Sequence, residues 1–221
     1  MEAKRPTIEF FFDILSAYSY IGFETLLSLD WEVNIALKPF LLFKVSKESG
    51  NIPPAMIKSK RSFVLRDLQR QAGHCGIKFC VPKRFPINTI PIMRFLVLLN
   101  ETNRIAAFKA TKVLFNLYWG CGFDVSIFAN VVEKLAYETG FSKDELAGMY
   151  KKSNEDENYL QILDKNCAEA LDAGAFGAPT MLVKLTSASH KEFFFGSDRF
   201  HHIQEYLESE QPALIPSKSK L

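Results

Sequence analysis

The first forty residues follow a strand–helix–strand pattern, and this order restricts the possible folds more than any other feature. Residues 7–13 are apolar and β-favouring, which predicts a buried strand. Residues 18–29 carry apolar side chains at helical spacing, and Ser16 is placed to act as the N-cap of this helix. Residues 33–39 alternate between apolar and polar side chains, as a second strand does. Because a helix connects the two strands, we expect them to pair in parallel in a βαβ unit.

The middle of the chain, from about residue 60 to residue 173, changes to a helical pattern in which apolar residues recur at spacings of three and four. Ser142 and Glu145 fit a capping box at the start of one helix, and Pro91 fits the first turn of another. The expected helices cover residues 61–72, 90–100, 104–119, 125–139, 143–152 and 158–171.

Strand patterns return after the helical block. Residues 180–185 and 191–195 are expected to form a hairpin, and residues 198–208 a final helix. From the order βαβ, helical block, ββα we expect an α/β protein with a thioredoxin-like fold and an all-helical domain inserted between its βαβ and ββα halves. The expected thioredoxin-like domain consists of residues 1–60 and 173–221, and the inserted helical domain consists of residues 61–172.

Charge and hydropathy exclude several classes of partner. The chain has 27 basic and 25 acidic residues and a net charge of +2, so we expect no nucleic-acid partner. No stretch approaches the roughly 20 apolar residues of a membrane span, so we expect no membrane partner. Hydrophobic residues make up 48% of the chain, which favours a packed core over disorder.

The four cysteines are Cys75, Cys80, Cys121 and Cys167, and no two of them are spaced Cys-x-x-Cys. We expect reduced thiols that pack as small apolar groups. A Cys75–Cys80 disulfide, or a zinc site that includes the neighbouring His74, is the less favoured alternative, because no further metal ligands are evident around them. We therefore expect no metal cofactor.

Two segments have the sequence expected at the active site of a thioredoxin-like protein. One is the turn Ser16-Ala17-Tyr18-Ser19 between the first strand and its helix, and the other is Pro179, directly before a later strand. The peptide bond before this proline is expected to be cis. The oxidoreductases of this fold have Cys-x-x-Cys at the turn, whereas serine at both ends cannot form a disulfide. The start of a helix still favours a negative charge, so a thiolate supplied by a ligand is the expected occupant.

The sequence resembles the kappa-class glutathione transferases over nearly its whole length, in four separated blocks that occur in the order of that family. The family has a thioredoxin-like fold with a helical insertion, binds glutathione and forms homodimers. The related 2-hydroxychromene-2-carboxylate isomerases also use glutathione. The resemblance therefore implies glutathione as co-substrate and a homodimeric protein. The blocks are residues 12–13 with 16–24, 49–54, 174–179 and 195–199.

The resemblance assigns the catalytic role to Ser16, whose hydroxyl would hydrogen-bond the glutathione sulfur. Ala17 and Tyr18 would complete this part of the glutathione site, and Asn51 and Lys60 match positions that contact the tripeptide, with Lys60 suited to a carboxylate. The family usually has Ser-Pro-Tyr-Ser-Trp where this chain has Ser-Ala-Tyr-Ser-Tyr. Alanine lacks the fixed φ of proline, so we expect a slightly less rigid turn with retained activity.

The other half of the implied glutathione site lies close to the C-terminal strands. Ala178, before the expected cis Pro179, would pair its backbone with the cysteinyl part of glutathione, as a strand does. Ser197 and Asp198 match the γ-glutamyl site. Ser197 is expected to be a helix N-cap whose neighbouring N–H groups suit a carboxylate, and Asp198 would balance the α-amino group. Arg199 would support Asp198 or reach the ligand.

Simpler interpretations of the same residues also exist. Ser16 could act only as an N-cap, Asp198 only as an acid in the first turn of a helix, and Asn51 only as a turn residue. Lys60 lies in a basic run of the kind that usually faces solvent, and the pair at residues 201–202, both histidine, is expected at the surface or in a dimer contact.

The function expected from these features is that of a glutathione transferase, which binds glutathione as a thiolate for attack on small electrophiles and, as a further option, on peroxides. The alternatives are a glutathione-dependent isomerase or peroxidase on the same site, and a non-catalytic thioredoxin-like binding module.

The sequence ends in Ser219-Lys220-Leu221, the tripeptide that the peroxisomal import receptor recognises. It follows a tail that contains proline and serine, and the N-terminus shows no secretory signal pattern. We therefore expect import into peroxisomes through this receptor, with the mitochondrion or the cytoplasm as the alternative.

Overall fold

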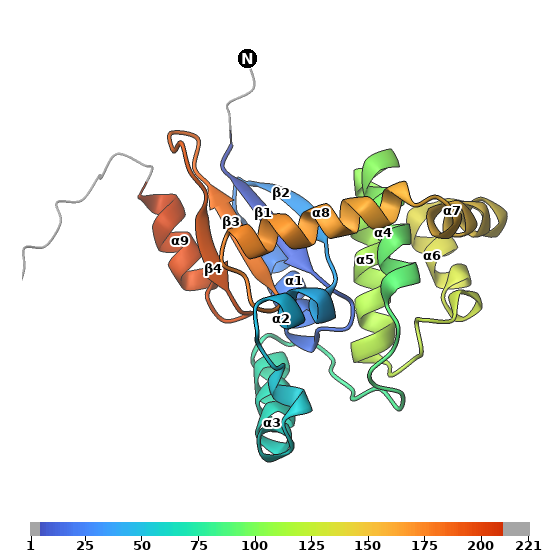
Figure 1. The fold of residues 1–221 in the computed structure, drawn as a ribbon, viewed down its shortest axis with the longest axis horizontal. Coiled ribbons are helices and arrows are strands. Elements are labelled where there is room, and N and C mark those ends of the chain that lie inside the picture. The colour runs from blue at the N-terminus through green and yellow to red at the C-terminus, as the bar shows by residue number, and fades with distance from the viewer. Residues whose placement is uncertain (1–4, 210–221) are drawn as a thin grey trace, which may run out of the picture.

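A four-stranded mixed sheet organises the part of the chain that the computed structural model describes, residues 5–209 (Figure 1). Its strands are β1 (Thr7–Phe12), β2 (Asn34–Pro39), β3 (Thr180–Lys184) and β4 (Glu192–Phe195). The sheet order is β2-β1-β3-β4, with β1 parallel to β2 and the other neighbouring pairs antiparallel. The expected βαβ unit and C-terminal hairpin are therefore confirmed.

The helical insertion between β2 and β3 is also confirmed. The capping box at Ser142 has both of its hydrogen bonds, and Pro91 lies in the first turn of its helix. No helix within residues 5–209 is both long and apolar enough to cross a bilayer. The α-helices are α1 (Ala17–Ser28), α2 (Leu42–Glu48), α3 (Lys58–His74), α4 (Ile90–Thr102), α5 (Arg104–Phe115), α6 (Val132–Thr139), α7 (Lys143–Glu155), α8 (Asn158–Asp172) and α9 (Phe200–Glu208).

Two of the expected helices are interrupted or shortened by other helical turns, whereas the remaining expected helices differ from their predicted bounds by at most three residues. The helix expected over residues 104–119 ends at Phe115 and continues as a π-helical turn, η2 (Asn116–Gly120). The helix expected over residues 125–139 is instead a 3₁₀ turn, η3 (Phe128–Asn130), followed by α6. In η2 the indole of Trp119 donates a hydrogen bond to the carbonyl oxygen of Ile14 at 2.9 Å, a tertiary contact that local periodicity does not reveal.

Helix α2 is absent from the sequence-based expectation. It has only seven residues, and its N-cap residue Leu41 makes no side-chain capping bond. The first N–H group of the helix is satisfied from elsewhere, because Leu42 N donates to the Asp13 carboxylate at 3.0 Å. Since Asp13 follows β1, 29 residues earlier in the chain, this cap depends on the tertiary fold.

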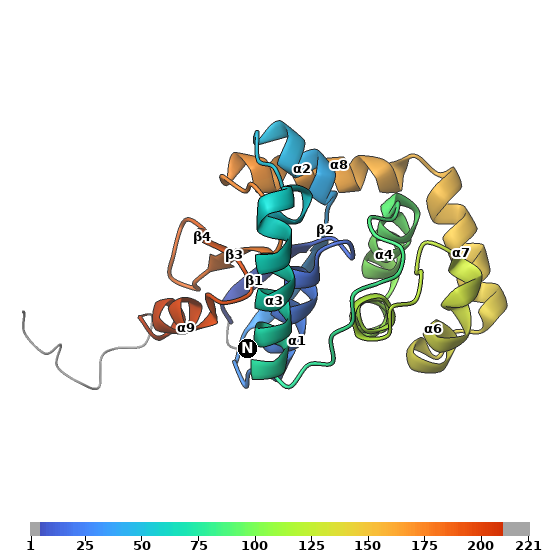
Figure 2. The same cartoon turned by 90° about the horizontal axis from the view of Figure 1, so that it is seen from below.

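Alternate side chains of β1 point to opposite faces of the sheet, and each face has its own aromatic core. Phe10 and Phe12 pack against Phe23 of α1, with ring centroids 6.0 and 6.5 Å apart. Phe11 points to the other face and packs against Phe40 at 6.3 Å. Helices α1 and α9 cover the first face, and α2 and α8 cover the second (Figure 2).

Helix α8 links the sheet to the helical insertion. It contacts α2 and β2 beside the sheet and also contacts α4 in the insertion (Figure 1). The expected domain boundaries at residues 60/61 and 172/173 stay predictions. The expected peroxisomal tripeptide, Ser219-Lys220-Leu221, lies outside the described residues.

Candidate functional site

The turn from β1 into α1, residues 13–19, is held by hydrogen bonds that the sequence supplies locally. The Asp13 carboxylate accepts a hydrogen bond from Leu15 N at 3.0 Å. The backbone carbonyl oxygen of Asp13 accepts one from Ser16 N at 2.9 Å. Ser16 has extended backbone angles and its Oγ accepts from Ser19 N at 3.0 Å, which is the geometry of an N-cap. The turn therefore brings the Ser16 hydroxyl to the positive end of the α1 dipole.

The Ser16 side chain also reaches the segment before β3. Its hydroxyl donates a hydrogen bond to the carbonyl oxygen of Ala178, at 3.2 Å, across 162 residues of sequence. The Ala178–Pro179 bond is cis, as expected. Gly22 of α1 lies against this proline, since a Cβ atom at position 22 would lie 3.1 Å from Pro179 Cγ. A larger residue at position 22 would therefore press against Pro179.

A chain of hydrogen bonds runs along the other side of the site. The Tyr18 hydroxyl donates to Asp67 Oδ2 at 2.8 Å, and the Gln71 amide donates to the same oxygen at 2.8 Å. The hydroxyl of Ser197 donates to Gln71 Oε1, again at 2.8 Å. Asp67 and Gln71 lie one turn apart on α3, and sequence reasoning missed both. Their spacing of four residues, which places them on one helix face, was the available sequence signal. The sequence did not show that α3 lies beside α1.

The environment of Tyr18 keeps its hydroxyl protonated. Burial raises the pKa of Tyr18 well above its usual value, and the hydrogen bond to the Asp67 carboxylate raises the pKa further. The phenol is therefore a hydrogen-bond donor in this structure, and Asp67 is the acceptor that it uses.

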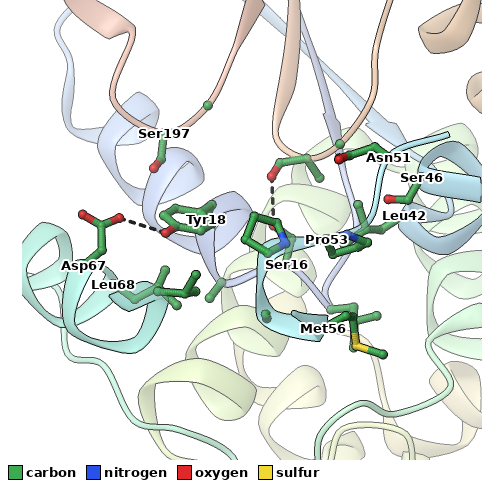
Figure 3. A pocket seen from close by; sticks show the side chains of 18 of the residues that line it. Ser16, Tyr18, Leu42, Ser46, Asn51, Pro53, Met56, Asp67, Leu68 and Ser197 are labelled. Carbon is green, nitrogen blue, oxygen red and sulfur yellow. Dashed lines mark hydrogen bonds between the residues drawn. The ribbon is translucent and has the colours of Figure 1, made fainter. Parts of the chain in front are cut away.

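A cavity of about 340 Å³ lies between the Ser16 turn, α2, α3, the segment before β3 and the end of β4 (Figure 3). Its volume lies within the usual range for a small-molecule site. The wall is largely apolar and carries two carboxylates, Asp67 and Asp198. Among the described residues that line it there is no lysine, arginine or histidine. The apolar part of the wall is formed by Leu15, Leu42, Phe43, Pro53, Pro54, Met56, Val64, Leu68, Phe85, Trp119 and Phe195, together with smaller side chains.

Most of the sequence-predicted site residues meet at this cavity. Pro179 is buried and is not part of the lining. Lys60 is exposed in the first turn of α3 and also lies outside the lining, as does Arg199. Asn51 is held in the wall, because its amide donates to the carbonyl oxygen of Phe176 at 2.7 Å. The predicted residues in the lining are Ser16, Ala17, Tyr18, Asn51, Ala178, Ser197 and Asp198.

Ser197 does not have the expected structural role. Helix α9 begins at Phe200 with Arg199 as its N-cap residue, so the interpretation of Ser197 as a helix N-cap is wrong. Its hydroxyl is instead committed to Gln71. Gly196, with a φ of 101°, redirects the chain just before it, and a Cβ at that position would lie 2.9 Å from the Asp198 carboxylate. Asp198 forms an ion pair with Arg199 at 2.8 Å.

The cysteines take no part in this cavity. All four are free thiols, but Cys75 and Cys121 are exposed and Cys80 is half-buried. The expectation that the cysteines pack as small apolar groups therefore fails for the two exposed ones and holds for Cys167. Burial raises the pKa of the Cys167 thiol to about 11. Within residues 5–209, no three of the His, Cys, Asp and Glu side chains come together as metal ligands would.

Comparison with known proteins agrees with this geometry. The family model described as a DSBA-like thioredoxin domain matches residues 7–208. The chain is 34% identical to glutathione S-transferase kappa 1 of Caenorhabditis elegans, over 99% of both chains. It is 28% identical to 2-hydroxychromene-2-carboxylate isomerase of Pseudomonas putida, over 90% of this chain and 93% of the relative. A solved 2-hydroxychromene-2-carboxylate isomerase structure, 22% identical, covers 92% of this chain and 95% of its own, with a TM-score of 0.74.

The chain therefore belongs to the DsbA-like thioredoxin family. Within that family it is similar along its whole length to kappa-class glutathione transferases, which confirms the resemblance found in the sequence.

Proposed function

We propose that the protein is a glutathione transferase in which Ser16 stabilises the glutathione thiolate. The observation that carries this proposal is the position of the Ser16 hydroxyl, which caps α1, faces the Ala178 carbonyl and lines a mainly apolar cavity. The similarity to kappa-class glutathione transferases supports the same function. Disulfide exchange at this turn is excluded, because positions 16 and 19 are both serine and a disulfide needs two cysteines.

The free energy needed to lower the pKa of the glutathione thiol is modest. A free thiol has a pKa of about 8.5, and lowering it by about two units requires about 2.7 kcal/mol. One charge-assisted hydrogen bond contributes roughly 1.5–3 kcal/mol, and a helix N-terminus adds roughly 0.3–1 kcal/mol. When a thiolate is bound, the Ser16 hydroxyl would turn from the Ala178 carbonyl to the sulfur. No further base from the protein is needed.

The proposed orientation of glutathione follows the chemistry of the cavity wall. Asp198 would bind the α-amino group of the γ-glutamyl residue, and the backbone of Ala178 would pair with the cysteinyl residue beside Ser16. The glycyl end would then extend toward Asn51, which lies across Ser16 from Tyr18 and Asp67 in Figure 3. Lys60, outside the lining, would approach the glycyl carboxylate from solvent.

The thiolate then reacts with a carbon electrophile against the apolar wall. Sulfur forms a bond to carbon and either displaces a leaving group with its electron pair, or adds to an activated double bond whose electron pair takes up a proton from water. In both cases the conjugate retains the sulfur. Phe43, Met56, Phe85 and Trp119 supply the apolar surface for such a substrate.

The test is a thiolate absorbance titration of glutathione bound to the purified protein. We expect a pKa well below that of free glutathione, and in Ser16→Ala a pKa that returns toward the free value with a slower conjugation rate. An unchanged titration in Ser16→Ala would overturn the role of Ser16. Absence of glutathione binding to the unmodified protein would instead support a non-catalytic binding module.

A glutathione-dependent isomerase is the second candidate, because 2-hydroxychromene-2-carboxylate isomerases share both the fold and 28% sequence identity with this chain. In an isomerase glutathione adds to the substrate and leaves again, and in a peroxidase it ends as the disulfide. Product analysis separates the transferase, the isomerase and the peroxidase, since only the transferase converts glutathione into a thioether product. We also propose a homodimer on the basis of the kappa-class resemblance, and sedimentation equilibrium would test it.

A further inference from the structure

Ser46 of α2 has a buried hydroxyl that forms no hydrogen bond within the described part of the chain. The residue is 3% exposed, and its Oγ has no hydrogen-bond partner among the atoms of residues 5–209. Ser46 is also part of the cavity lining, and Figure 3 shows it next to Asn51 and Leu42. A buried hydroxyl without a partner costs free energy, so its place in the wall of a ligand cavity needs an explanation.

Other helical hydroxyls of this chain avoid that cost by bonding to the preceding turn. Thr25, Thr102 and Thr139 each donate to the carbonyl oxygen four residues earlier, at 2.7–2.9 Å. Ser46 makes no such bond to Leu42. Ser19 and Thr111 are likewise buried without a partner, but neither lines the cavity.

Ser46 is also the uncommitted hydroxyl of the cavity wall. Of the hydroxyl groups among the described lining residues, Ser16 donates to Ala178, Tyr18 donates to Asp67 and Ser197 donates to Gln71. Among these described lining residues, only Ser46 has a hydroxyl proton that no acceptor within residues 5–209 takes up. Ser46 therefore supplies the one hydroxyl proton of this part of the wall that no described residue takes up, and a ligand oxygen reaches its covered Oγ when the side chains around it shift slightly.

The surroundings of Ser46 decide which acceptor fits. Leu42, Phe43, Pro53 and Met56 make this part of the wall apolar, and the lining contains no cationic side chain among the described residues. A buried carboxylate needs a cation or several donors, whereas this part of the wall offers only the Ser46 hydroxyl and the Asn51 amide, which already donates to Phe176. A neutral oxygen on an apolar molecule, such as a ketone or aldehyde carbonyl, is matched by a single donor.

We propose that Ser46 is a specificity-determining residue for the second substrate, which is an apolar electrophile that carries one neutral oxygen acceptor. This inference rests on the proposed transferase function and names the class of electrophile that the site prefers. Unsaturated ketones and aldehydes have this form. Ser46 binds the carbonyl oxygen while the apolar wall holds the carbon skeleton.

The experiment compares two aromatic electrophiles, benzylideneacetone, which has a carbonyl group, and benzyl chloride, which has none. Both are tested with the unmodified protein, Ser46→Ala and the control Thr111→Val, which removes a buried unpartnered hydroxyl outside the cavity. A neutral hydrogen bond contributes about 0.5–1.5 kcal/mol, so we expect Ser46→Ala to lower kcat/KM for benzylideneacetone about three- to tenfold. The rate with benzyl chloride and both rates of Thr111→Val should change less than about twofold.

Two additional measurements separate this inference from the transferase proposal. Calorimetry measures the affinity for the two preformed glutathione conjugates and so gives the same comparison without turnover. Ser46→Ala should weaken binding only of the conjugate that retains the ketone. Equal losses for both compounds, or a weaker affinity for glutathione itself, would overturn the role of Ser46 and leave the transferase intact. Absence of conjugation with both electrophiles in the unmodified protein would overturn the transferase proposal.

Thermal unfolding distinguishes a ligand contact from a structural role. Because the hydroxyl has no partner, Ser46→Ala should keep or raise the melting temperature while it lowers the preference for the ketone. A clear fall in melting temperature would assign Ser46 a structural role instead.

Discussion

The Asp13 carboxylate accepts the backbone N–H of Leu42 with one oxygen and that of Leu15 with the other, both at 3.0 Å. One buried side chain therefore fixes both the turn that carries Ser16 and the start of α2. The Asp13 carboxylate therefore positions both the wall that we assign to glutathione and the wall that we assign to the electrophile.

We expect Asp13→Asn to lower the free energy of unfolding by about 1–3 kcal/mol, because an amide has one acceptor oxygen and leaves one of the two buried N–H groups without a partner. Denaturant unfolding measures this change. Asp172→Asn, at an exposed position in the last turn of α8, is the control that should have almost no effect. Comparable losses in the two variants would contradict the assignment.

The same substitution should alter the dependence of stability on pH. Burial raises the pKa of Asp13 above its ordinary value of 3.8 and outweighs the hydrogen bonds that lower it. The folded protein then holds this proton more tightly than the unfolded chain, so the Asp13 contribution to stability falls as the pH rises from about 3.8 to the folded pKa. Asp13→Asn should remove this component. Parallel stability curves for the two proteins would exclude it.

Tyr18→Phe should leave the titration of bound glutathione unchanged. The Tyr18 hydroxyl donates to Asp67, so it is not available to the sulfur. Ser16→Ala, by contrast, should raise the thiolate pKa. Thiolate absorbance of both variants, measured side by side, tests the division of roles, and an upward shift in Tyr18→Phe would show that the phenol contributes directly.

Gln71→Met should weaken glutathione binding about three- to tenfold, since it removes the acceptor that orients the Ser197 hydroxyl and a donor to Asp67. Gln69→Met, on the exposed face of the same helix, is the matched control. Calorimetric titration with glutathione measures the affinity of both variants. Equal affinities in the two variants would mean that the hydrogen-bond chain does not serve the ligand.

Thiol alkylation of the native protein should modify Cys75 and Cys121 first and Cys167 last. The first two are exposed, whereas Cys167 is buried with its pKa raised to about 11, so little thiolate forms near neutral pH. Mass spectrometry after short exposure to iodoacetamide gives the order. Early modification of Cys167 would contradict the packing of α8 against the sheet.

The local features of this fold were predictable because short sequence signals determine them. The apolar run of β1, the cap at Ser16 and the capping box at Ser142 all act within a few residues. Helix α2 was not predictable, because its cap comes from Asp13 after β1. The boundary of α5 was misjudged for a related reason, since Trp119 bonds to Ile14.

The candidate site shows the same division. Ser16, Ala178 and Asp198 could be found from the sequence and its family resemblance, and the structure brings them to one cavity. The misinterpretation of Ser197 came from treating a serine before a helix as its cap, when its hydroxyl bonds to α3. Asp67, Gln71 and Ser46 are ordinary helical residues in sequence, and only the tertiary packing of α2 and α3 gives them a role.

The hydrogen bond between Ser16 and Ala178 spans 162 residues, and the entire helical insertion lies within that span. A nascent chain or a proteolytic fragment that stops before β3 contains the Ser16 turn but not its opposite wall. Glutathione affinity should therefore report completed folding of this protein, appearing only after the last strands have joined the sheet. The ligand would then also act as a selective stabiliser of the fully assembled chain over truncated forms.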